Sequence, residues 1–532
     1  MRCLAGLGLV VLAGGLLASG CDVERTLKHR RDPTALVVAR ATGTISLDPL
    51  LVTDSESLEV AGLLFEGLVR WKRGTTEVVP GLATSWTVSP DSLRWRFVIR
   101  PGVTFHDGTA LDPAAVVFSF DRLLDPKHPH YVGPAGAYWR ALLKDVTDVV
   151  ALDASTVEIH IARPYAPLLA DLARFPIVSP TAVVHHGDAF KVNPVGTGPF
   201  ELETWSPGAY VVTRRNPAYW DTKPQLERIV FRVVADDRQR VVDLESGSVD
   251  IATPVLPDEQ PFVELHPDLD LHLAPANDVT YLAFNLERPP FDDVRVRRAV
   301  SHAINKLPIV KLAFQGRAVA ADSPLPPTQW GHHTPRITYE FDPARARALL
   351  AEAAADHRFD PNATFKLYAP STPRAYLSQP ERVARLIQSA LTQVGIKTEL
   401  VLQPYAAHRA SINAGAHDLA LFGWIGETGD PDNFLYVLFH SDGATRGSAN
   451  NIAFYRNPGV DSLLAQAQAT RDVPTRSGLY AAIQDQIADD APWVPLAHSE
   501  LVIAARAEIG DVLMSPLGHP IYTLIRRGRA SR

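Results

Sequence analysis

The alternation of apolar and polar residues in the first third of the chain predicts antiparallel strands. In LRWRFVIR, residues 93–100, every second residue is apolar, which is typical of a strand with one buried face. TVEIHI, residues 156–161, follows the same pattern. Between them, Asp112 as an N-cap and Pro113 as the first helical residue predict a helix. This part of the chain therefore combines antiparallel strands with a helix.

From about residue 228 the sequence pattern changes, and segments typical of strands alternate with segments typical of helices. Apolar positions recur with a helical period in residues 291–305 and again after Asp342. Over residues 364–424, strand, helix, strand, helix and strand patterns alternate. This succession predicts a mainly parallel sheet with helices on its faces, so the expected fold class is α/β.

Candidate chemistry is concentrated in LALFGWIGETGDPDNFLY, residues 419–436. The apolar first half predicts a buried strand, and the glycines with Glu427, Asp430 and Asp432 predict an acidic loop after it. Loops at the carboxyl ends of strands are the places where open α/β sheets bind ligands. The alternative is that the DPDN sequence only shapes a turn through its aspartate side chains.

The start of the chain has the pattern of a secretory signal over residues 1–20, with Arg2, an apolar run and small residues before Cys21. The apolar run is too short to indicate a membrane-spanning helix. LLASGC resembles a bacterial lipobox, with Ala18 where leucine is usual, so Cys21 is the predicted lipidation site. The alternative is an ordinary signal cleaved near Ala18. Residues 21–35 are charged and predict a tether.

Composition narrows the classes of function. The formal charge is −7 and the charges are interspersed, so we expect no nucleic-acid partner. The only cysteines are Cys3 and Cys21, which leaves no disulfide in the predicted mature chain. The length suits two or three domains. The neighbours His106 and Asp107 are interpreted as loop-shaping residues. The histidine pair His185 and His186 lacks further ligands at metal spacing, so no metal or cofactor is predicted.

Seven segments in a fixed order resemble the dipeptide, oligopeptide and nickel-binding family of solute-binding proteins of ABC transporters. They are FEGLVRW, SWTVSPDSLRWRFVIRPGVTFHDG, PVGTGPF, RRNPAYW, YLAFN, DDVRVRRAVSHAIN and GWIGETGDPDNF. The resemblance covers residues 36 to about 520.

The resemblance implies a two-lobed periplasmic-binding-protein fold of cluster C type, with an extra subdomain inserted in lobe I. Mapped onto this chain, lobe I spans residues 36–278, with the insertion at about 66–192. Lobe II spans residues 279–497, and residues 498–532 return to lobe I. Closure of the two lobes around a ligand is how this architecture acts.

The resemblance also implies candidate ligand-binding residues. In the dipeptide-binding branch, an acidic residue after WxG receives the peptide ammonium group, and WIGE places Glu427 there. An arginine upstream of an IQ pair holds the peptide carboxylate, and this position is Arg374. Trp424 is expected to line the site, and Asp430 joins the candidates from the same loop. Glutamate is one methylene longer than the usual aspartate, so specificity is expected to differ.

The expected function is capture of peptides, with short ones favoured, and delivery to a membrane permease and its ATPase. The expected protein is a lipid-anchored monomer at the outer face of the cytoplasmic membrane or in the periplasm. Other solutes stay open, namely nickel chelates, oligosaccharides and antibiotics; His332 and His333 are the pair that suggests nickel, against a loop interpretation. A sensor or chaperone lipoprotein is another alternative. A hydrolase is disfavoured because GxSxG and HExxH motifs are absent.

Overall fold

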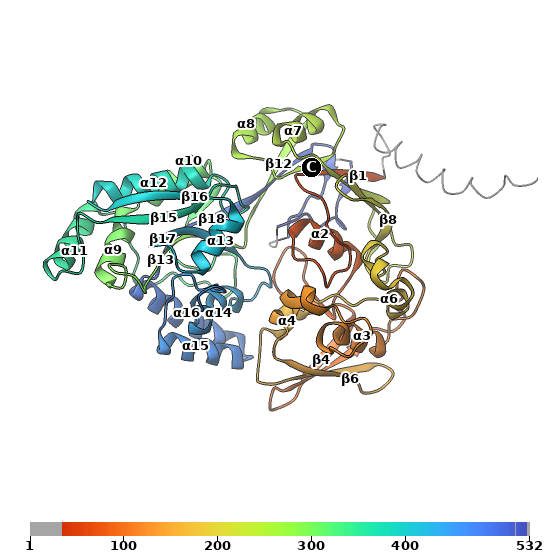
Figure 1. The fold of residues 1–532 in the computed structure, drawn as a ribbon. Coiled ribbons are helices and arrows are strands. Elements are labelled where there is room, and N and C mark those ends of the chain that lie inside the picture. The colour runs from red at the N-terminus through yellow and green to blue at the C-terminus, as the bar shows by residue number, and fades with distance from the viewer. Residues whose placement is uncertain (1–33, 516–517, 529–532) are drawn as a thin grey trace, which may run out of the picture.

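Two lobes lie side by side in the structure, a computed structural model that describes residues 34–515 and 518–528 (Figure 1). The predicted signal, Cys21 and nearly all of the predicted tether lie outside the described residues. Within the described part, no helix combines the length and the apolar character needed to cross a bilayer. A continuous sheet of twelve strands joins the two lobes, in the order β16-β15-β17-β13-β18-β11-β1-β10-β9-β8, with β12 and β14 also paired to β18.

The second lobe contains the alternating segment that the sequence predicted. Strand β15 pairs in parallel with both β16 and β17, while β13 is antiparallel to its neighbours, so the expectation of a mainly parallel arrangement over residues 364–424 is confirmed. The elements are β13 (Asp278–Phe284), α9 (Val294–Ala303), α10 (Lys306–Ala313), β14 (Ala318–Ala320), α11 (Pro343–Ala355), β15 (Thr364–Pro370), α12 (Pro380–Gln393), β16 (Lys397–Gln403), α13 (Tyr405–Asn413), β17 (Leu419–Ile425), α14 (Asp432–Phe439), α15 (Pro458–Ala469) and α16 (Val473–Asp490).

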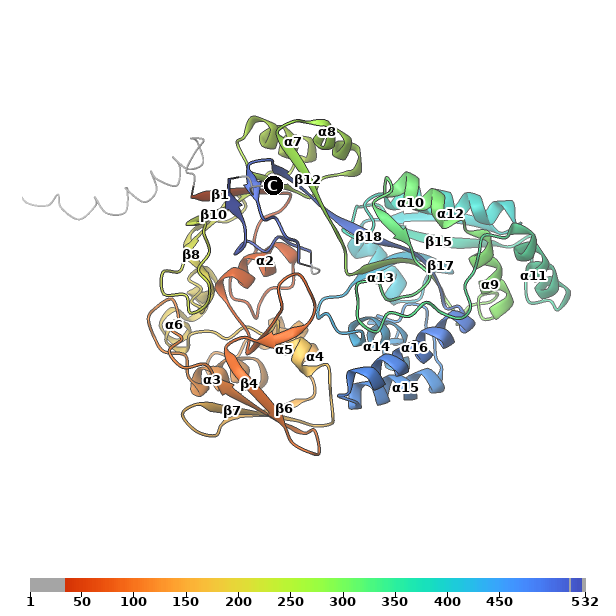
Figure 2. The ribbon, with the colours of Figure 1, turned by 180° about the vertical axis from the view of Figure 1, so that it is seen from behind.

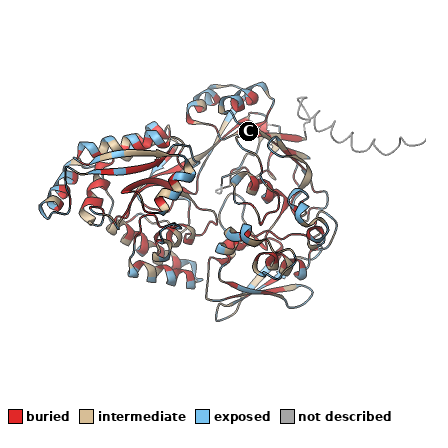
Figure 3. Cartoon of the chain, in the orientation of Figure 1, coloured by how far each residue is buried: buried red, intermediate tan, exposed pale blue. Residues whose placement is uncertain are grey.

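Helices cover both faces of this sheet, because successive residues of β13 belong alternately to two different cores. Leu282 and Phe284 belong to the core beneath α9, α11 and α12, whereas Tyr281 and Ala283 belong to the core beneath α14, α15 and α16. All seven residues of β13 are buried, whereas the edge strand β16 contains no buried residue (Figure 3). Helix α9 is shorter than the predicted 291–305, because Asp293 caps it by accepting from the Arg295 N–H.

The first lobe holds the other half of the sheet. Strand β1 is parallel to β10 and β11, and β9 is antiparallel to both of its neighbours, β8 and β10. The elements are β1 (Ala35–Arg40), α2 (Ser55–Leu64), α6 (Pro180–His186), β8 (Phe200–Ser206), β9 (Tyr210–Arg215), β10 (Arg228–Val233), α7 (Asp237–Ser246), β11 (Ile251–Thr253), α8 (Gln260–Leu265), β12 (Leu269–Pro275), and the short pair β19 (Ile509–Gly510) and β20 (Arg526–Arg527).

Strand β18 (Trp493–Arg506) belongs to both lobes and crosses between them beside β12 (Figure 2). Its first half pairs with β13 and its second half with β12 and β11. At the crossing, the buried carboxylate of Asp278 accepts hydrogen bonds from the Ser499 N–H, at 2.8 Å, and from the Ser499 hydroxyl. Burial raises the pKa of Asp278 to about 6, which the Ser499 hydrogen bonds oppose. The Asp278 side chain thus links the start of β13 to the middle of β18 at the crossing between the lobes.

The residues of the predicted insertion form a separate four-stranded sheet, in the order β4-β5-β7-β6. The predicted strands at 93–100 and 156–161 are β5 and β7, and the helix capped by Asp112 is α3. A core of its own fills the space between sheet and helices. The elements are β2 (Val69–Trp71), β3 (Val78–Pro80), β4 (Ala83–Val88), β5 (Arg94–Ile99), α3 (Pro113–Leu124), α4 (Ala137–Leu142), β6 (Val146–Ala151), β7 (Thr156–Ile161) and α5 (Leu168–Leu172).

The buried carboxylate of Glu66 joins three of the sequence motifs. It accepts hydrogen bonds from the Thr197 hydroxyl at 2.9 Å, the Tyr219 hydroxyl at 2.9 Å and the Trp220 indole N–H at 2.8 Å. These residues come from FEGLVRW, PVGTGPF and RRNPAYW. Burial raises the pKa of Glu66, and the three hydrogen bonds oppose that rise. Helix α2 ends at Leu64, two residues before this carboxylate.

The glycines of PVGTGPF allow the chain to approach the end of α2. A Cβ on Gly198 would lie 2.2 Å from the Leu63 carbonyl oxygen, and one on Gly196 would lie 2.1 Å from the Leu64 carbonyl oxygen. His106 holds the same stretch, because its Nδ1 accepts from the Gly196 N–H at 3.3 Å and its Nε2 lies 3.1 Å from the Gly198 carbonyl oxygen. The loop-shaping interpretation of His106 is therefore confirmed.

We expect Glu66→Ala to destabilise the protein by about 3–5 kcal/mol, because three buried donors lose their acceptor. Glu66→Gln keeps an acceptor oxygen and should lose less. Urea denaturation followed by tryptophan fluorescence measures both variants against the unmodified protein. Equal and small losses in the two variants would contradict a central role for this carboxylate.

Candidate functional site

Two of the candidate residues, Glu427 and Asp430, lie in the loop where β17 ends and α14 begins. Gly426 has no room for a side chain, since a Cβ there would lie 2.2 Å from the Phe434 ring. Asn277, at the crossing between the lobes, exchanges two hydrogen bonds with Gly426: the Gly426 N–H donates to the Asn277 carbonyl at 2.7 Å, and the Asn277 amide donates to the Gly426 carbonyl at 2.9 Å. The Asn433 side chain accepts from the Glu427 N–H at 3.0 Å. These contacts fix the loop.

The side chain of Glu427 points at the first lobe. Arg174 Nη1 lies 3.2 Å from Glu427 Oε2 and 3.2 Å from the Glu427 carbonyl oxygen. The Tyr138 hydroxyl donates to the same Oε2. The Glu427 side chain is 40% exposed and that of Arg174 is 13% exposed, so the ion pair stands at the edge of the contact between the lobes. Glu427 therefore already has a cationic partner.

Further contacts join the predicted insertion to the second lobe. The Trp71 indole N–H donates to the Thr428 carbonyl at 3.2 Å. A Cβ on Gly429 would lie 2.6 Å from the Thr76 side chain, and its φ of 73° favours glycine. The Ala166 N–H donates to the backbone carbonyl of Gln468, a residue of α15, at 2.7 Å. The two lobes thus touch along the loop and along α15.

Asp430 is buried, and its carboxylate is occupied within the second lobe. Arg476 in α16 donates to both of its oxygens, at 3.0 and 2.8 Å, a bidentate pair of the strong kind. Asp430 Oδ1 also accepts from the Asp432 N–H at 3.0 Å. The Arg476 guanidinium lies 4.9 Å from the centre of the Trp330 ring. Asp430 therefore holds the loop to α16, and its ligand-binding role stays a prediction.

Two carboxyl groups near the contact between the lobes each have one buried oxygen that accepts no hydrogen bond from the described residues. Asp432 accepts from the Gln468 amide at 3.0 Å through Oδ2, but its Oδ1 is buried without a partner among the described residues. Asp171, in α5, likewise has a buried Oδ2 without a partner among the described residues. Burial and the charge of Asp430 raise the pKa of Asp432 to about 7. Burial and the charge of Asp432 raise the pKa of Asp171 well above its usual range. Burial thus disfavours the charged form of both groups, and Asp432 titrates near neutral pH.

An aromatic row connects the remaining candidates on the second lobe. Phe422 and Trp424 lie on the same face of β17, because strand residues two apart point the same way. The Tyr405 ring is parallel to Phe422, with centroids 6.3 Å apart, and the Arg374 guanidinium lies 4.1 Å from the Tyr405 centroid. Arg374 is exposed. Trp424 is half-buried and donates to Asn433 at 3.3 Å. The row leads from Arg374 toward Glu427.

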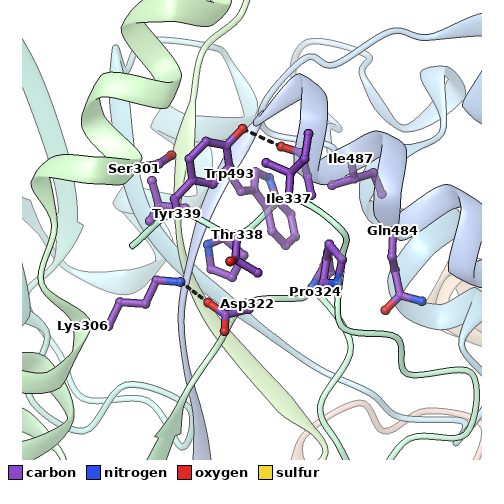
Figure 4. A pocket seen from close by; sticks show the side chains of 14 residues that line it. Ser301, Lys306, Asp322, Pro324, Ile337, Thr338, Tyr339, Gln484, Ile487 and Trp493 are labelled. Carbon is purple, nitrogen blue, oxygen red and sulfur yellow. Dashed lines mark hydrogen bonds and ion pairs between the residues drawn. The ribbon is translucent and has the colours of Figure 1, made fainter. Parts of the chain in front are cut away.

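The histidine pair and the pocket of Figure 4 lie apart from this row. His332 Nδ1 lies 2.9 Å from the Leu325 carbonyl oxygen, and His333 Nε2 lies 3.1 Å from Asp485. No cluster of three or more potential metal ligands occurs in the described part of the chain. The pocket holds about 20 Å³, enough for a water molecule but not for a peptide. Lys306 and Asp322 form an ion pair at one side of it, and none of the candidate residues lines it.

Comparison with known families matches residues 77–446 to the bacterial extracellular solute-binding proteins, family 5 Middle. The chain belongs to this family. The family and the two-lobed α/β fold expected from the sequence motifs are therefore confirmed.

Relatives of this family 5 chain match over nearly their whole length. It is 33% identical over 523 residues to the dipeptide-binding protein of Escherichia coli (strain K12), covering 95% of this chain and 97% of that protein. It is 30% identical over 546 residues to the heme-binding protein A of Haemophilus influenzae, covering 97% of both. A Helicobacter pylori ABC transporter-associated periplasmic binding protein, solved with the peptide STSA, matches with a TM-score of 0.78 and 30% identity over 93% of this chain and 98% of that one.

Sequence patterns in this family 5 chain did not reveal the partners from the first lobe. Arg174 and Tyr138 are separated from Glu427 by 253 and 289 positions. Nothing in their local sequence marks them, because Tyr138 lies on α4, Arg174 follows the end of α5, and only the packing of the lobes brings them to Glu427. Trp71 stood in a recognised motif, yet its contact with Thr428 also depends on how the lobes meet.

Acidification should stabilise this lobe contact through Asp432. Its pKa is about 7 when folded, above the usual value near 3.9, so its favourable contribution is complete below about pH 4 and is lost as the pH rises through 7. Between pH 6 and pH 8 the loss is about 1.4 kcal/mol. Asp432→Asn is neutral at every pH and should gain about that much relative to the unmodified protein. Melting curves at both pH values test this, and a difference that does not change with pH would contradict it.

Proposed function

We propose that this family 5 protein is the extracytoplasmic solute-binding subunit of an ABC importer and captures short peptides between its two lobes. The observation that carries the proposal is the row of aromatic side chains on the second lobe. A cation, Arg374, lies over its first ring, and an anion, Glu427, follows its last residue, Trp424, in the loop that the first lobe contacts. The similarity to a dipeptide-binding protein over 95% of the chain supports the choice of ligand.

Peptide ends have the charges that this arrangement can satisfy. An α-carboxylate can receive two parallel N–H donors from the planar guanidinium of Arg374, and an α-ammonium group can donate to Glu427. Enclosing a peptide between the lobes removes both charges from water, and an unpaired charge there is costly. Trp424 supplies apolar contact area between the two ends. A positioning role is proposed for Asp430, whose carboxylate holds the loop through Arg476.

The proposal includes the partners expected from the sequence. Delivery requires a membrane permease with its ATPase, and lipidation at Cys21 would keep the monomeric binding protein near that complex. We propose binding without covalent chemistry. Nickel chelates, oligosaccharides, antibiotics and heme, the ligand that one relative's name states, are the competing solutes. A lipoprotein that senses or chaperones peptides would use the same residues without a permease.

A thermal-shift screen of the mature protein should find its largest shifts with dipeptides and tripeptides. A ligand at a hundred times its dissociation constant adds about 2.7 kcal/mol to the stability, which raises the melting temperature. Blocking the peptide ends by acetylation and amidation should remove the shift. A response to heme, a nickel chelate or an oligosaccharide, with none to any peptide, would overturn the choice of ligand.

Arg374→Ala and Glu427→Gln should each weaken peptide binding by about 2–5 kcal/mol, which corresponds to about 30-fold or more. Each variant leaves a peptide charge enclosed without its partner. Titration calorimetry measures the affinities. Arg385→Ala is the matched control, because Arg385 is an exposed arginine of α12 that pairs only with Glu381 one turn away. Unchanged affinity in both site variants would reject the site and leave the fold assignment intact.

A further inference from the structure

The carboxylate expected to receive the ligand's ammonium group already pairs with a cation from the other lobe. Arg174 Nη1 lies 3.2 Å from Glu427 Oε2, and the Tyr138 hydroxyl donates to the same oxygen. A simple peptide would add a second cation beside this pair. One carboxylate would then face an ammonium group and a guanidinium, and the enclosed group would keep one uncompensated positive charge.

Neighbouring acids do not supply the missing negative charge. Asp430 is paired with Arg476, so that pair is neutral as a whole. Asp171 lies close to Arg174 in sequence, but burial raises its pKa well above the usual range, which disfavours its charged form. Burial likewise raises the pKa of Asp432 to about 7. The compensating charge has to come from the ligand.

Arg174 has donors left to pair with such a negative charge. Within the described chain, its guanidinium donates only through Nη1, and neither Nε nor Nη2 is among the buried nitrogen atoms that lack a partner. Both atoms therefore keep contact with solvent and can donate to a second carboxylate. Arginine presents its donors as a planar fork, which suits a carboxylate approaching from the open side.

We propose that Arg174 makes this end of the site selective for peptides whose N-terminal residue carries its own carboxylate, aspartate or glutamate. The proposal rests on the proposed function, peptide binding at Glu427. The ligand's ammonium group binds Glu427 and its side-chain carboxylate binds Arg174, so two positive and two negative charges balance. Arg174 comes from the first lobe and Glu427 from the second, so such a ligand also bridges the lobes in place of their direct ion pair.

Matched peptides isolate the charge. Asp-Phe and Asn-Phe have almost the same shape, and so have Asp-Ala-Ala-Phe and Asn-Ala-Ala-Phe, which extend the test to a second length. Titration calorimetry with the mature protein should give at least about tenfold tighter binding of the aspartyl member at one length or both. In Arg174→Gln this preference should disappear or reverse, because Glu427 becomes free for the ammonium group of a neutral peptide. Arg174→Lys should keep the preference in the same direction.

A control separates selectivity from lobe closure. Arg163 also crosses to the second lobe, where its Nη1 donates to Gln468 at 2.9 Å, but it does not touch Glu427. Arg163→Gln should change the affinities for both members of a pair by the same factor. A loss of preference in that variant as well would overturn the role of Arg174.

Two other results overturn the proposal in distinguishable ways. Equal affinity of the unmodified protein for the aspartyl and asparaginyl peptides at both lengths would reject the selectivity and leave peptide binding intact. Failure of all four peptides to bind, in a preparation that responds to another solute in the thermal-shift screen, would reject the proposed function and the selectivity together.

Discussion

The pairing of one strand with both lobes constrains everything else in this molecule. Strand β18 hydrogen bonds to β13 through its first half and to β12 and β11 through its second half. The lobes therefore share a continuous sheet, and any change in their relative orientation has to be absorbed near Asp278 and Ser499. Bending elsewhere would break ladder hydrogen bonds whose groups are buried, and these are costly to leave unpaired. Few residues can act as the hinge.

Three of the seven motifs that reveal the family contribute one or two residues each to a common junction. Glu66, Thr197 and Trp220 lie far apart in the sequence and meet around one carboxylate. Glycines stand where backbone passes backbone without space for a side chain. Such residues cannot be replaced singly, which explains why weak local patterns become informative when they occur together and in order.

The sequence predicted local structure better than it predicted the site. Period-2 and helical patterns located β5, β7, α3 and the β15 to β17 segment because burial of one face determines them locally. Asp430 could not be understood in the same way, since its partner Arg476 lies on a helix that packs against the loop only after folding. Arg174 was missed because its significance arises from the contact of two lobes. The acidic loop suggested a ligand for Asp430, whereas Arg476 of the protein itself pairs with it.

The two hydrogen bonds between Asn277 and Gly426 connect mechanics with recognition. Asn277 belongs to the crossing between the lobes, and Gly426 immediately precedes Glu427. A rotation at the crossing therefore pulls directly on the backbone that carries Glu427, through one backbone hydrogen bond and one from the Asn277 amide. With the proposed role of Glu427, the residence time of a ligand and the choice of ligand depend on the same few atoms. Evolution of a new specificity in this chain would then carry a change in release kinetics with it.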